Sequence, residues 1–240
     1  MNMNMKITHK PAAPKTVAIY SGGMDSFTLV HELSRMGRLA ACLSFDYGQR
    51  HVRELNMARF VCNQLRVHHH VIDLRSLAPH MLGSALTDKV AVPEGHYAEE
   101  SMKLTVVPNR NAIMLNVAIA FAVSHKLDEV AFAAHAGDHT IYPDCREEFV
   151  AAMNVVGLLA NWHPVRVVAP YVKLTKAEIL AVGLAHGLDY SDTWTCYKGG
   201  DVSCGVCGSC TERQEAFVQC GTIDPLPYAS RYLMKDGGAQ

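Results

Sequence analysis

Residues 16–26 read TVAIYSGGMDS, a short β-branched and aromatic run followed at once by two glycines and an acidic residue. The run 16–20 has the composition of a buried strand, and the residues up to about Met36 have the periodicity of a helix that Gly37 would end. Adjacent glycines between a strand and a helix let backbone N–H groups approach an anion, and the helix N-terminus attracts negative charge. We therefore expect a phosphate-binding loop, which consists of Tyr20, Ser21, Gly22, Gly23, Met24, Asp25 and Ser26.

The polar side chains of this loop suit a phosphate group bound together with magnesium. Ser21 and Ser26 can donate hydroxyl hydrogen bonds to phosphate oxygens. Asp25 would repel a phosphate but suits a Mg²⁺ ion that bridges phosphates. No lysine follows the glycines, so the loop is not a Walker A motif.

Strand-like and helix-like segments alternate along the chain beyond this loop. Further strands are expected at 39–45, 69–73, 129–134 and 165–169, and further helices at about 111–125, 144–160 and 175–186. Thr175 and Glu178 form a capping box at the start of the last helix, and Gly187 would end it. Residues 74–104 lack periodicity and predict a long irregular excursion. The alternation predicts an α/β fold with a doubly wound, mostly parallel sheet of five strands.

Composition narrows the class of protein. The chain has 240 residues, of which 49% are hydrophobic and 19% charged, and its net charge is −1. This composition supports a buried core and excludes a disordered or coiled-coil chain. The balanced charge gives no general attraction to nucleic acid or to an anionic membrane. No apolar stretch approaches the roughly 20 residues of a membrane span, and the N-terminus lacks the apolar core of a signal peptide. We expect a cytoplasmic protein without direct nucleic-acid or membrane partners.

The cysteines near the C-terminus predict a metal site. In a reducing compartment the eight cysteines are expected to be thiols or metal ligands. Four of them follow the spacing C-x7-C-x2-C-x2-C, which favours a closed tetrahedral Zn²⁺ site. An iron–sulfur cluster is the alternative, but the ferredoxin run would need a cysteine where Gln214 stands. The four expected ligands are Cys196, Cys204, Cys207 and Cys210.

These patterns predict three parts of the chain. Residues 1–14 form a flexible leader, residues 15–190 an α/β domain, and residues 191–240 a small zinc-held C-terminal segment. Within the α/β domain a polar cluster follows each expected strand: SGGMDS, DYGQRH, DLRS, HAGDH and PYVKLTK, in chain order. Ligands of open α/β sheets bind beyond the carboxyl ends of the strands, so the clusters predict one anionic-ligand site at that edge.

Two levels of family resemblance follow from these motifs. The SGGMDS loop resembles that of the PP-loop ATP pyrophosphatases, which split ATP between its α- and β-phosphates and adenylate a substrate oxygen. Eight further segments resemble, in the same order, the 7-cyano-7-deazaguanine synthase family over about residues 16–225. They are SFDYGQRH (44–51), HHVIDL (69–74), GSALTD (83–88), AVPE (91–94), VPNRN (107–111), YPDCREEF (142–149), LTKAEI (174–179) and TWTCY (193–197). The sequence departs from the family's usual pattern at Asn109, where glycine is more usual, and over residues 138–141.

The resemblance implies an adenine nucleotide α-hydrolase-like fold and an ATP-dependent ligase of the queuosine or deazapurine pathway. Such an enzyme converts 7-carboxy-7-deazaguanine and ammonia into 7-cyano-7-deazaguanine through an acyl-adenylate and an amide, with release of AMP and pyrophosphate. The resemblance also implies ATP, Mg²⁺ and Zn²⁺ as cofactors and a homodimer as the assembly.

Within this resemblance, arginines are candidates to hold a phosphate or the substrate carboxylate, because a planar guanidinium suits both. Asp144 could accept N–H bonds from the amino-pyrimidine edge of the base. The expected catalytic residues are Ser21, Asp25, Arg110 and Arg146. The expected substrate contacts are Tyr47, Gln49, Arg50, Asp138, Asp144 and Arg146.

Alternative functions share the nucleotide loop. A related enzyme could stop at the amide or attach the deazaguanine to another acceptor. A tRNA-thiolating transferase would need a basic face and a pair of reactive thiols, and the near-neutral charge and the lack of a clear partner for Cys145 argue against it. A non-catalytic nucleotide-binding module would release no pyrophosphate with any substrate.

Overall fold

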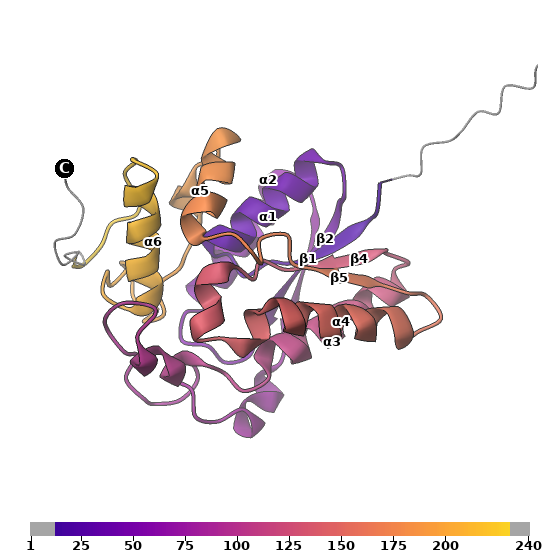
Figure 1. The fold of residues 1–240 in the computed structure, drawn as a ribbon, viewed down its shortest axis with the longest axis horizontal. Helices are drawn as coiled ribbons and strands as arrows, with labels where there is room; N and C mark the ends of the chain where they lie inside the picture. Colours follow the sequence, from indigo (N-terminus) through magenta and orange to yellow (C-terminus); the bar gives the residue numbers. More distant parts are fainter. Residues whose placement is uncertain (1–12, 231–240) are drawn as a thin grey trace, which may run out of the picture.

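The centre of the molecule is one parallel β-sheet. The computed structural model describes residues 13–230, so the expected leader over 1–14 lies almost wholly outside the described residues. Five strands follow the order β3-β2-β1-β4-β5, and every neighbouring pair is parallel. They are β1 (Thr16–Ile19), β2 (Leu39–Asp46), β3 (His68–Asp73), β4 (Glu129–Ala131) and β5 (Arg166–Val168). The predicted fold class is confirmed (Figure 1).

Helices cover both faces of the sheet. They are α1 (Met24–Arg35), α2 (Arg53–Leu65), α3 (Arg110–Ser124), α4 (Glu147–Leu159), α5 (Lys176–Ala185) and α6 (Gly208–Gln219). α3 and α4 lie on one face, and α1, α2 and α5 lie on the other (Figure 1). None of the helices between residues 13 and 230 is long and apolar enough to span a bilayer.

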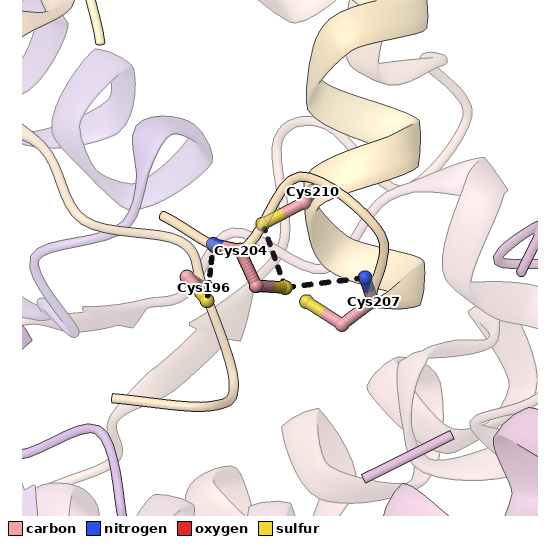
Figure 2. Close-up of side chains that lie close together, drawn as sticks. All are labelled: Cys196, Cys204, Cys207 and Cys210. Carbon is pink, nitrogen blue, oxygen red and sulfur yellow. Dashed lines mark hydrogen bonds between the residues drawn. The ribbon is translucent and has the colours of Figure 1, made fainter. Parts of the chain in front are cut away.

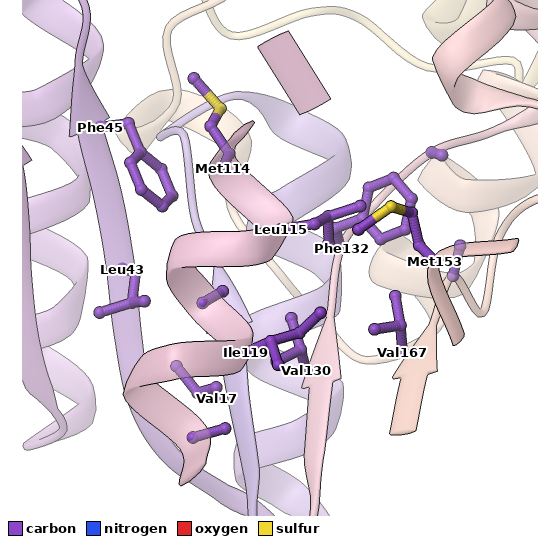
Figure 3. Close-up of a cluster of buried hydrophobic side chains, with 14 of the residues drawn as sticks. Val17, Leu43, Phe45, Met114, Leu115, Ile119, Val130, Phe132, Met153 and Val167 are labelled. Atoms are coloured by element: carbon purple, nitrogen blue, oxygen red, sulfur yellow. The ribbon is translucent and has the colours of Figure 1, made fainter. Parts of the chain in front are cut away.

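The core is divided by the sheet because neighbouring side chains of a strand point to opposite faces. Val17 and Leu43 belong to the buried cluster beneath α3 and α4 (Figure 3). Ala18 and Cys42 belong to the cluster on the α1 and α2 side. The central strands β1 and β2 therefore bury apolar side chains on both faces, and polar side chains gather at the edge beyond the carboxyl ends of the strands.

Helix ends follow the local signals in the sequence. The Thr175 side chain accepts a hydrogen bond from the backbone N–H of Glu178, and the Glu178 carboxylate accepts one from the N–H of Thr175 at 2.7 Å. Gly37 and Gly187 follow α1 and α5 with φ of 66° and 71°, a conformation in which glycine has no steric penalty.

One predicted helix begins later than expected. A 3₁₀ turn, Pro143–Cys145, precedes α4, which begins at Glu147 instead of near residue 144. The reason is that the Asp144 side chain serves another helix: its Oδ2 accepts a hydrogen bond from the backbone N–H of Asn111 at 3.2 Å, in the first turn of α3. The helix-initiating residue was recognised in the sequence, but not the helix that it caps.

The helix α6 was not predicted from the sequence. The cysteine- and glycine-rich composition of the C-terminal segment hides a helix that packs beside α5 (Figure 1). Ala216 and Phe217 of α6 share a buried cluster with Phe27 of α1. The irregular excursion also reaches this segment, where Glu94 pairs with Cys207 in an isolated antiparallel bridge. Apolar packing therefore ties the C-terminal segment to the α/β domain.

Candidate active site

A cavity opens beyond the carboxyl ends of three neighbouring strands, at the edge predicted from the polar clusters. Ser21 follows β1, Tyr47 follows β2 and His135 follows β4, and all three line it. Arg110 lines it from the N-terminus of α3, and Glu212 lines it from α6. Segments far apart in the sequence thus meet at one site, as parallel strand topology requires.

The phosphate loop, residues 20–26, forms one wall of the cavity. Ser21 Oγ accepts a hydrogen bond from the Gly23 N–H at 3.2 Å and lies 3.0 Å from Ser26 Oγ. No side chain caps the N-terminus of α1, so its first N–H groups remain suited to an anion. Except for Gly22, all seven predicted loop residues line the cavity.

Gly22 has a different reason to be glycine. Its φ is 93°, and a Cβ there would lie 2.2 Å from the backbone oxygen of Glu54 on α2. The Gly22 carbonyl accepts a hydrogen bond from the Trp194 N–H at 2.9 Å. The glycine therefore allows α2 and the segment after α5 to close on the loop.

A buried lysine shares two carboxylates behind this loop. Lys176 Nζ lies 2.7 Å from Asp25 Oδ2 and 3.1 Å from Glu212 Oε2. His135 Nε2 lies 3.7 Å from Asp25 Oδ2 and 3.4 Å from Asp138 Oδ2. Burial alone would raise the pKa of Asp25, but Lys176 and His135 outweigh it and hold that pKa below 3.8. We call Asp25, Lys176 and Glu212 the shared-lysine cluster.

Arg110 is a cation without a carboxylate partner at the other side of the cavity. Its Nη1 donates to Tyr47 Oη at 3.3 Å, and its guanidinium carbon lies 5.7 Å from the centre of the Tyr47 ring. Among residues 13–230, no carboxylate oxygen lies within 4.0 Å of this guanidinium. The aromatic side chains of Tyr142 and Tyr197 line the same region. The guanidinium is therefore available to an anionic ligand.

Glu54 is a carboxylate near this arginine. Its Oε1 accepts a hydrogen bond from Gln49 Nε2 at 3.2 Å and lies 3.4 Å from His51 Nε2. Burial raises the pKa of Glu54 to about 8, although Gln49 and Arg110 oppose the rise. Burial and the charge of Arg110 lower the pKa of His51 to about 3, so this imidazole is neutral at pH 7.

The structure does not bring all predicted substrate contacts into the cavity. Of the predicted contacts, Tyr47 and Asp138 line it, as do Ser21, Asp25 and Arg110 of the expected catalytic residues. The other four predicted contacts do not line the cavity and bind backbone groups instead. Gln49 is buried and donates to Phe45 O at 3.0 Å, and Asp144 caps α3. Arg50 and Arg146 are exposed; Arg50 donates to Asp88 O, and Arg146 donates to His139 O at 2.9 Å.

Sequence reasoning missed several residues that line the cavity. They are His51, Glu54, Lys176, Trp194, Tyr197 and Glu212. Family resemblance could have pointed to four of these residues, because the segments that carry the resemblance include His51, Lys176, Trp194 and Tyr197. The sequence pattern does not distinguish Lys176, in the first turn of a helix, from an ordinary surface lysine. Only its burial in the structure identifies it as part of the site.

The four predicted metal ligands converge in the C-terminal segment. The Sγ atoms of Cys196, Cys204, Cys207 and Cys210 lie within 4.8 Å of one another (Figure 2). The pair Cys204–Cys210 is 3.9 Å apart, close to the roughly 3.8 Å expected for two sulfurs of a tetrahedron with metal–sulfur bonds of about 2.3 Å. The N–H groups of Cys204 and Cys207 donate to neighbouring sulfurs, which favours thiolates. This four-cysteine cluster can hold a metal ion.

The cluster also positions part of the active site. Cys207 is the N-cap of α6, and Cys210 lies in its first turn. The second turn contains Glu212, which contacts Lys176, and Arg213, which is buried against Asp224. A metal bound by the cysteines would therefore fix the start of the helix that carries one of the shared-lysine carboxylates.

Replacing Lys176 by methionine tests the shared-lysine cluster. The variant leaves Asp25 and Glu212 as buried carboxylates without their cation, so we expect the free energy of unfolding at pH 7 to fall by about 3 kcal/mol in urea denaturation. Lys173→Met is the control, because Lys173 is exposed and contacts Glu147 at 3.0 Å on the surface; its change should stay within about 0.5 kcal/mol.

The size of this loss should depend on pH. In the wild type the pKa of Asp25 is lowered, so its stabilising effect is present above pH 3.8 and is lost as the pH falls through the folded-state value. In Lys176→Met the pKa values of both carboxylates should rise, and protonation should relieve the penalty. The loss should be smaller at pH 5 than at pH 7, and an equal loss at both would exclude unpaired carboxylates as its cause.

Comparisons with known proteins match this chain over most of its length. The family model of the queuosine biosynthesis protein QueC matches residues 15–221. The 7-cyano-7-deazaguanine synthase 1 of Colwellia psychrerythraea is 54% identical over 90% of this chain and 99% of that protein. The corresponding synthases of Hahella chejuensis and Rhizobium etli are 56% and 49% identical, over 90% and 94% of this chain and 94% and 97% of theirs. The chain belongs to the QueC family of queuosine biosynthesis proteins.

Proposed function

We propose that this chain is an ATP-dependent ligase that converts 7-carboxy-7-deazaguanine and ammonia into 7-cyano-7-deazaguanine. The names of its relatives and the family description support the proposal. The structural observation that carries it is Arg110, a guanidinium that lines the cavity without a carboxylate partner among the described residues. It offers a bidentate receptor for the carboxylate that the substrate brings.

The cavity walls suit the flat ring system of this substrate. Tyr47, Phe132, Tyr142 and Tyr197 contribute aromatic side chains, and Met114 contributes a flexible apolar one. Aromatic and thioether groups pack well against a planar heterocycle. Asp138, an expected substrate contact, supplies a carboxylate on the same wall, which can accept hydrogen bonds from ring or amino N–H groups.

The phosphate loop and the shared-lysine cluster support binding of ATP with Mg²⁺. Asp25 Oδ1 is buried and has no hydrogen-bond partner, as expected of an oxygen reserved for a cation. Together with Asp138 and Glu212, the carboxylates of this region outnumber Lys176, so the charge balance fits an added divalent ion. When bound, Mg²⁺ would neutralise phosphate charge, with Asp25 as its proposed ligand.

In the proposed reaction ATP activates the same carbon twice. A carboxylate oxygen first attacks the α-phosphorus and pyrophosphate leaves; ammonia then displaces AMP and forms an amide. A second ATP activates the amide oxygen, and loss of AMP gives the nitrile. No step needs a covalent bond to the protein, so the chain contributes positioning and charge neutralisation. The phosphate loop and Arg110 line the same cavity, so they can hold the two reactants side by side.

The environment of Cys145 argues against the thiolation alternative. This thiol lines the cavity but is 5% exposed, and burial followed by the charges of Asp138 and Asp144 raises its pKa. A nucleophilic cysteine needs a lowered pKa so that the thiolate is populated. Cys145 instead contacts Asn111 Nδ2 at 3.4 Å, in the helix-capping arrangement at the start of α3.

The departure at Asn109 concerns the backbone and not the substrate. Asn109 precedes α3 with φ of 56°, in the left-handed region that glycine occupies without strain. Asparagine is among the non-glycine residues that adopt this conformation most readily. The substitution therefore keeps the turn that presents Arg110, and it supports the same substrate as in the family.

We propose Zn²⁺ as the ion of the four-cysteine cluster and the cytoplasm as the compartment. Four thiolates in a compact, closed arrangement are the usual ligands of structural zinc. The free thiols of all eight cysteines are consistent with a reducing compartment. Zinc would hold the start of α6 and with it the position of Glu212.

We propose a homodimer formed through α4. Ala152, Val155, Leu159 and Trp162 follow a 3-4 spacing and are exposed, with Leu159 exposed to 79%. Ala152, Val155 and Leu159 lie on α4, and Trp162 lies three residues beyond its end. This apolar stripe is the kind of surface by which a helix packs against a second helix. No charged residue occurs between positions 149 and 165, which favours a second copy of the same apolar stripe over a charged partner.

Mass spectrometry of products tests the proposed reaction. The wild type with ATP, Mg²⁺, ammonium and 7-carboxy-7-deazaguanine should yield the nitrile, AMP and pyrophosphate, and Asp25→Ala should not. Arg110→Met should lower kcat/KM for the carboxylate substrate by about 100-fold or more, with little change in ATP affinity. Arg59→Met is the control because Arg59 is exposed on α2. Absence of AMP with the wild type would refute the proposed function.

Elemental analysis tests the zinc assignment. The wild type should carry about one zinc per chain, and Cys207→Ser should lose it together with thermal stability, because metal binding contributes folding free energy. Cys220→Ser is the matched control, since Cys220 lies outside the cluster and its Sγ contacts Ala177 O. Iron with visible absorption in place of zinc would show an iron–sulfur cluster.

Analytical ultracentrifugation tests the dimer. Leu159→Glu should convert the assembly to a monomer, because a charge would be buried in the apolar stripe. Ile223→Glu, at another exposed apolar residue (82% exposed), should leave the assembly unchanged. A wild-type monomer at micromolar concentration, or a dimer unaffected by Leu159→Glu, would contradict the proposal.

A further inference from the structure

The four carboxylates that line the cavity are not equivalent. Asp25 and Glu212 share Lys176, and Asp138 lies 3.4 Å from His135. Glu54 contacts Gln49 and His51, and the latter is neutral because burial and Arg110 lower its pKa to about 3. Among residues 13–230 neither Glu54 nor Asp138 has a lysine or arginine nitrogen within 4.0 Å of its carboxylate, and Glu54 is the one of the two whose backbone packs against Gly22 of the phosphate loop. A cationic ligand would find its counter-charge there.

Glu54 also lies between the two halves of the proposed chemistry. Its backbone oxygen packs against Gly22 so closely that a Cβ on Gly22 would lie 2.2 Å away. Its carboxylate is close enough to Arg110 for that charge to oppose the rise of its pKa. The reacting carboxyl carbon must lie between the phosphate loop and Arg110, so Glu54 is beside the place where the new bond forms.

The Glu54 side chain is held in place from one side and open on the other. Gln49 Nε2 donates both to Glu54 Oε1 and to Phe45 O at the end of β2, while Gln49 Oε1 accepts from the Tyr47 N–H at 2.9 Å. Gln49 is therefore fixed by the strand and fixes Glu54 in turn. No hydrogen bond to Glu54 Oε2 forms within residues 13–230, and the side chain, 12% exposed, lines the cavity.

We propose that Glu54 is the catalytic residue that binds ammonium and removes its proton. The inference rests on the proposed function, which requires ammonia as nucleophile. At neutral pH the dissolved species is mainly ammonium, which has no lone pair for attack. An ordinary carboxylate is too weak a base for this proton, but the raised pKa of Glu54, about 8, brings it closer to that of ammonium. The ionised fraction of Glu54 at neutral pH is the form that binds the cation, and the bound cation favours that ionised form.

The proton and electron balance is complete. One N–H bond of ammonium breaks and an O–H bond forms on Glu54, which leaves ammonia with a lone pair. That pair forms the C–N bond to the acyl-adenylate, and the C–O bond to AMP breaks with its electrons on the departing phosphate. The phosphate takes the excess proton of the new C–N centre, which gives the amide and AMP. Glu54 then returns its proton to solvent.

The test separates adenylation from amine attack in the full chain with ATP and Mg²⁺. Exchange of labelled pyrophosphate into ATP, dependent on 7-carboxy-7-deazaguanine, reports adenylation alone. Amide formation from ammonium reports the complete step, and hydroxamate formation from hydroxylamine reports attack by a nucleophile that is already neutral at about pH 7.5. Glu54→Gln keeps the size of the side chain and an oxygen that can accept from Gln49. The control is Glu100→Gln, an exposed carboxylate paired with Lys103.

We expect Glu54→Gln to lose about 100-fold or more in amide formation from ammonium, while exchange and hydroxamate formation stay within about threefold of the wild type. Its melting temperature and ATP affinity should match those of Glu100→Gln. An equal loss in all three assays would give Glu54 a structural role, and undiminished amide formation would exclude it as the base; either result overturns the inference. A wild type that exchanges pyrophosphate but makes no amide refutes the ammonium step, whereas a wild type without exchange refutes the proposed function itself and the inference with it.

Discussion

The ammonium group of Lys176 is the interaction on which the active site depends. It joins Asp25 of the phosphate loop to Glu212 of α6, so a strand–loop–helix unit near the N-terminus is tied to a helix that begins at a cysteine cluster near the C-terminus. Buried carboxylates are costly without a cation, and a buried lysine is costly without carboxylates. Each charge is therefore stabilised by the others, and the C-terminal segment contributes part of the cavity lining.

Charge is arranged unequally around the cavity, and the inequality matches the proposed chemistry. Beside the phosphate loop one lysine lies between two carboxylates, and the excess negative charge fits a magnesium ion bound with the phosphates. Elsewhere in the cavity Arg110 has no carboxylate within 4.0 Å, and Glu54 faces neutral side chains, among the described residues. Unpaired groups of this kind reduce stability, and a substrate carboxylate and an ammonium ion would supply the missing counter-charges. The charges of the site are thus better balanced with the proposed reactants bound than without them.

Much of the fold was predictable because it follows from short-range rules. Alternating strands and helices, the capping box at Thr175 and the glycines after α1 and α5 are local features of the chain. The cysteine spacing likewise predicted the cluster, since closely spaced ligands can converge on one ion with little help from the rest of the chain. By contrast α6 escaped prediction, because its stability comes from Ala216 and Phe217 packing against a distant helix.

The sequence by itself determined the fold class, the strand–loop–helix unit at residues 16–35, the cluster of four cysteines and the family resemblance, because each depends on residue types at fixed spacing. Tertiary structure alone decided which polar residues face the cavity. Arg110 and Arg146 are both expected catalytic residues by sequence, yet of the two only Arg110 lines the cavity. Lys176 and Glu54 look like surface residues of amphipathic helices until the sheet order places them beside the phosphate loop. Burial and charge pairing depend on contacts between distant segments, which no local pattern encodes.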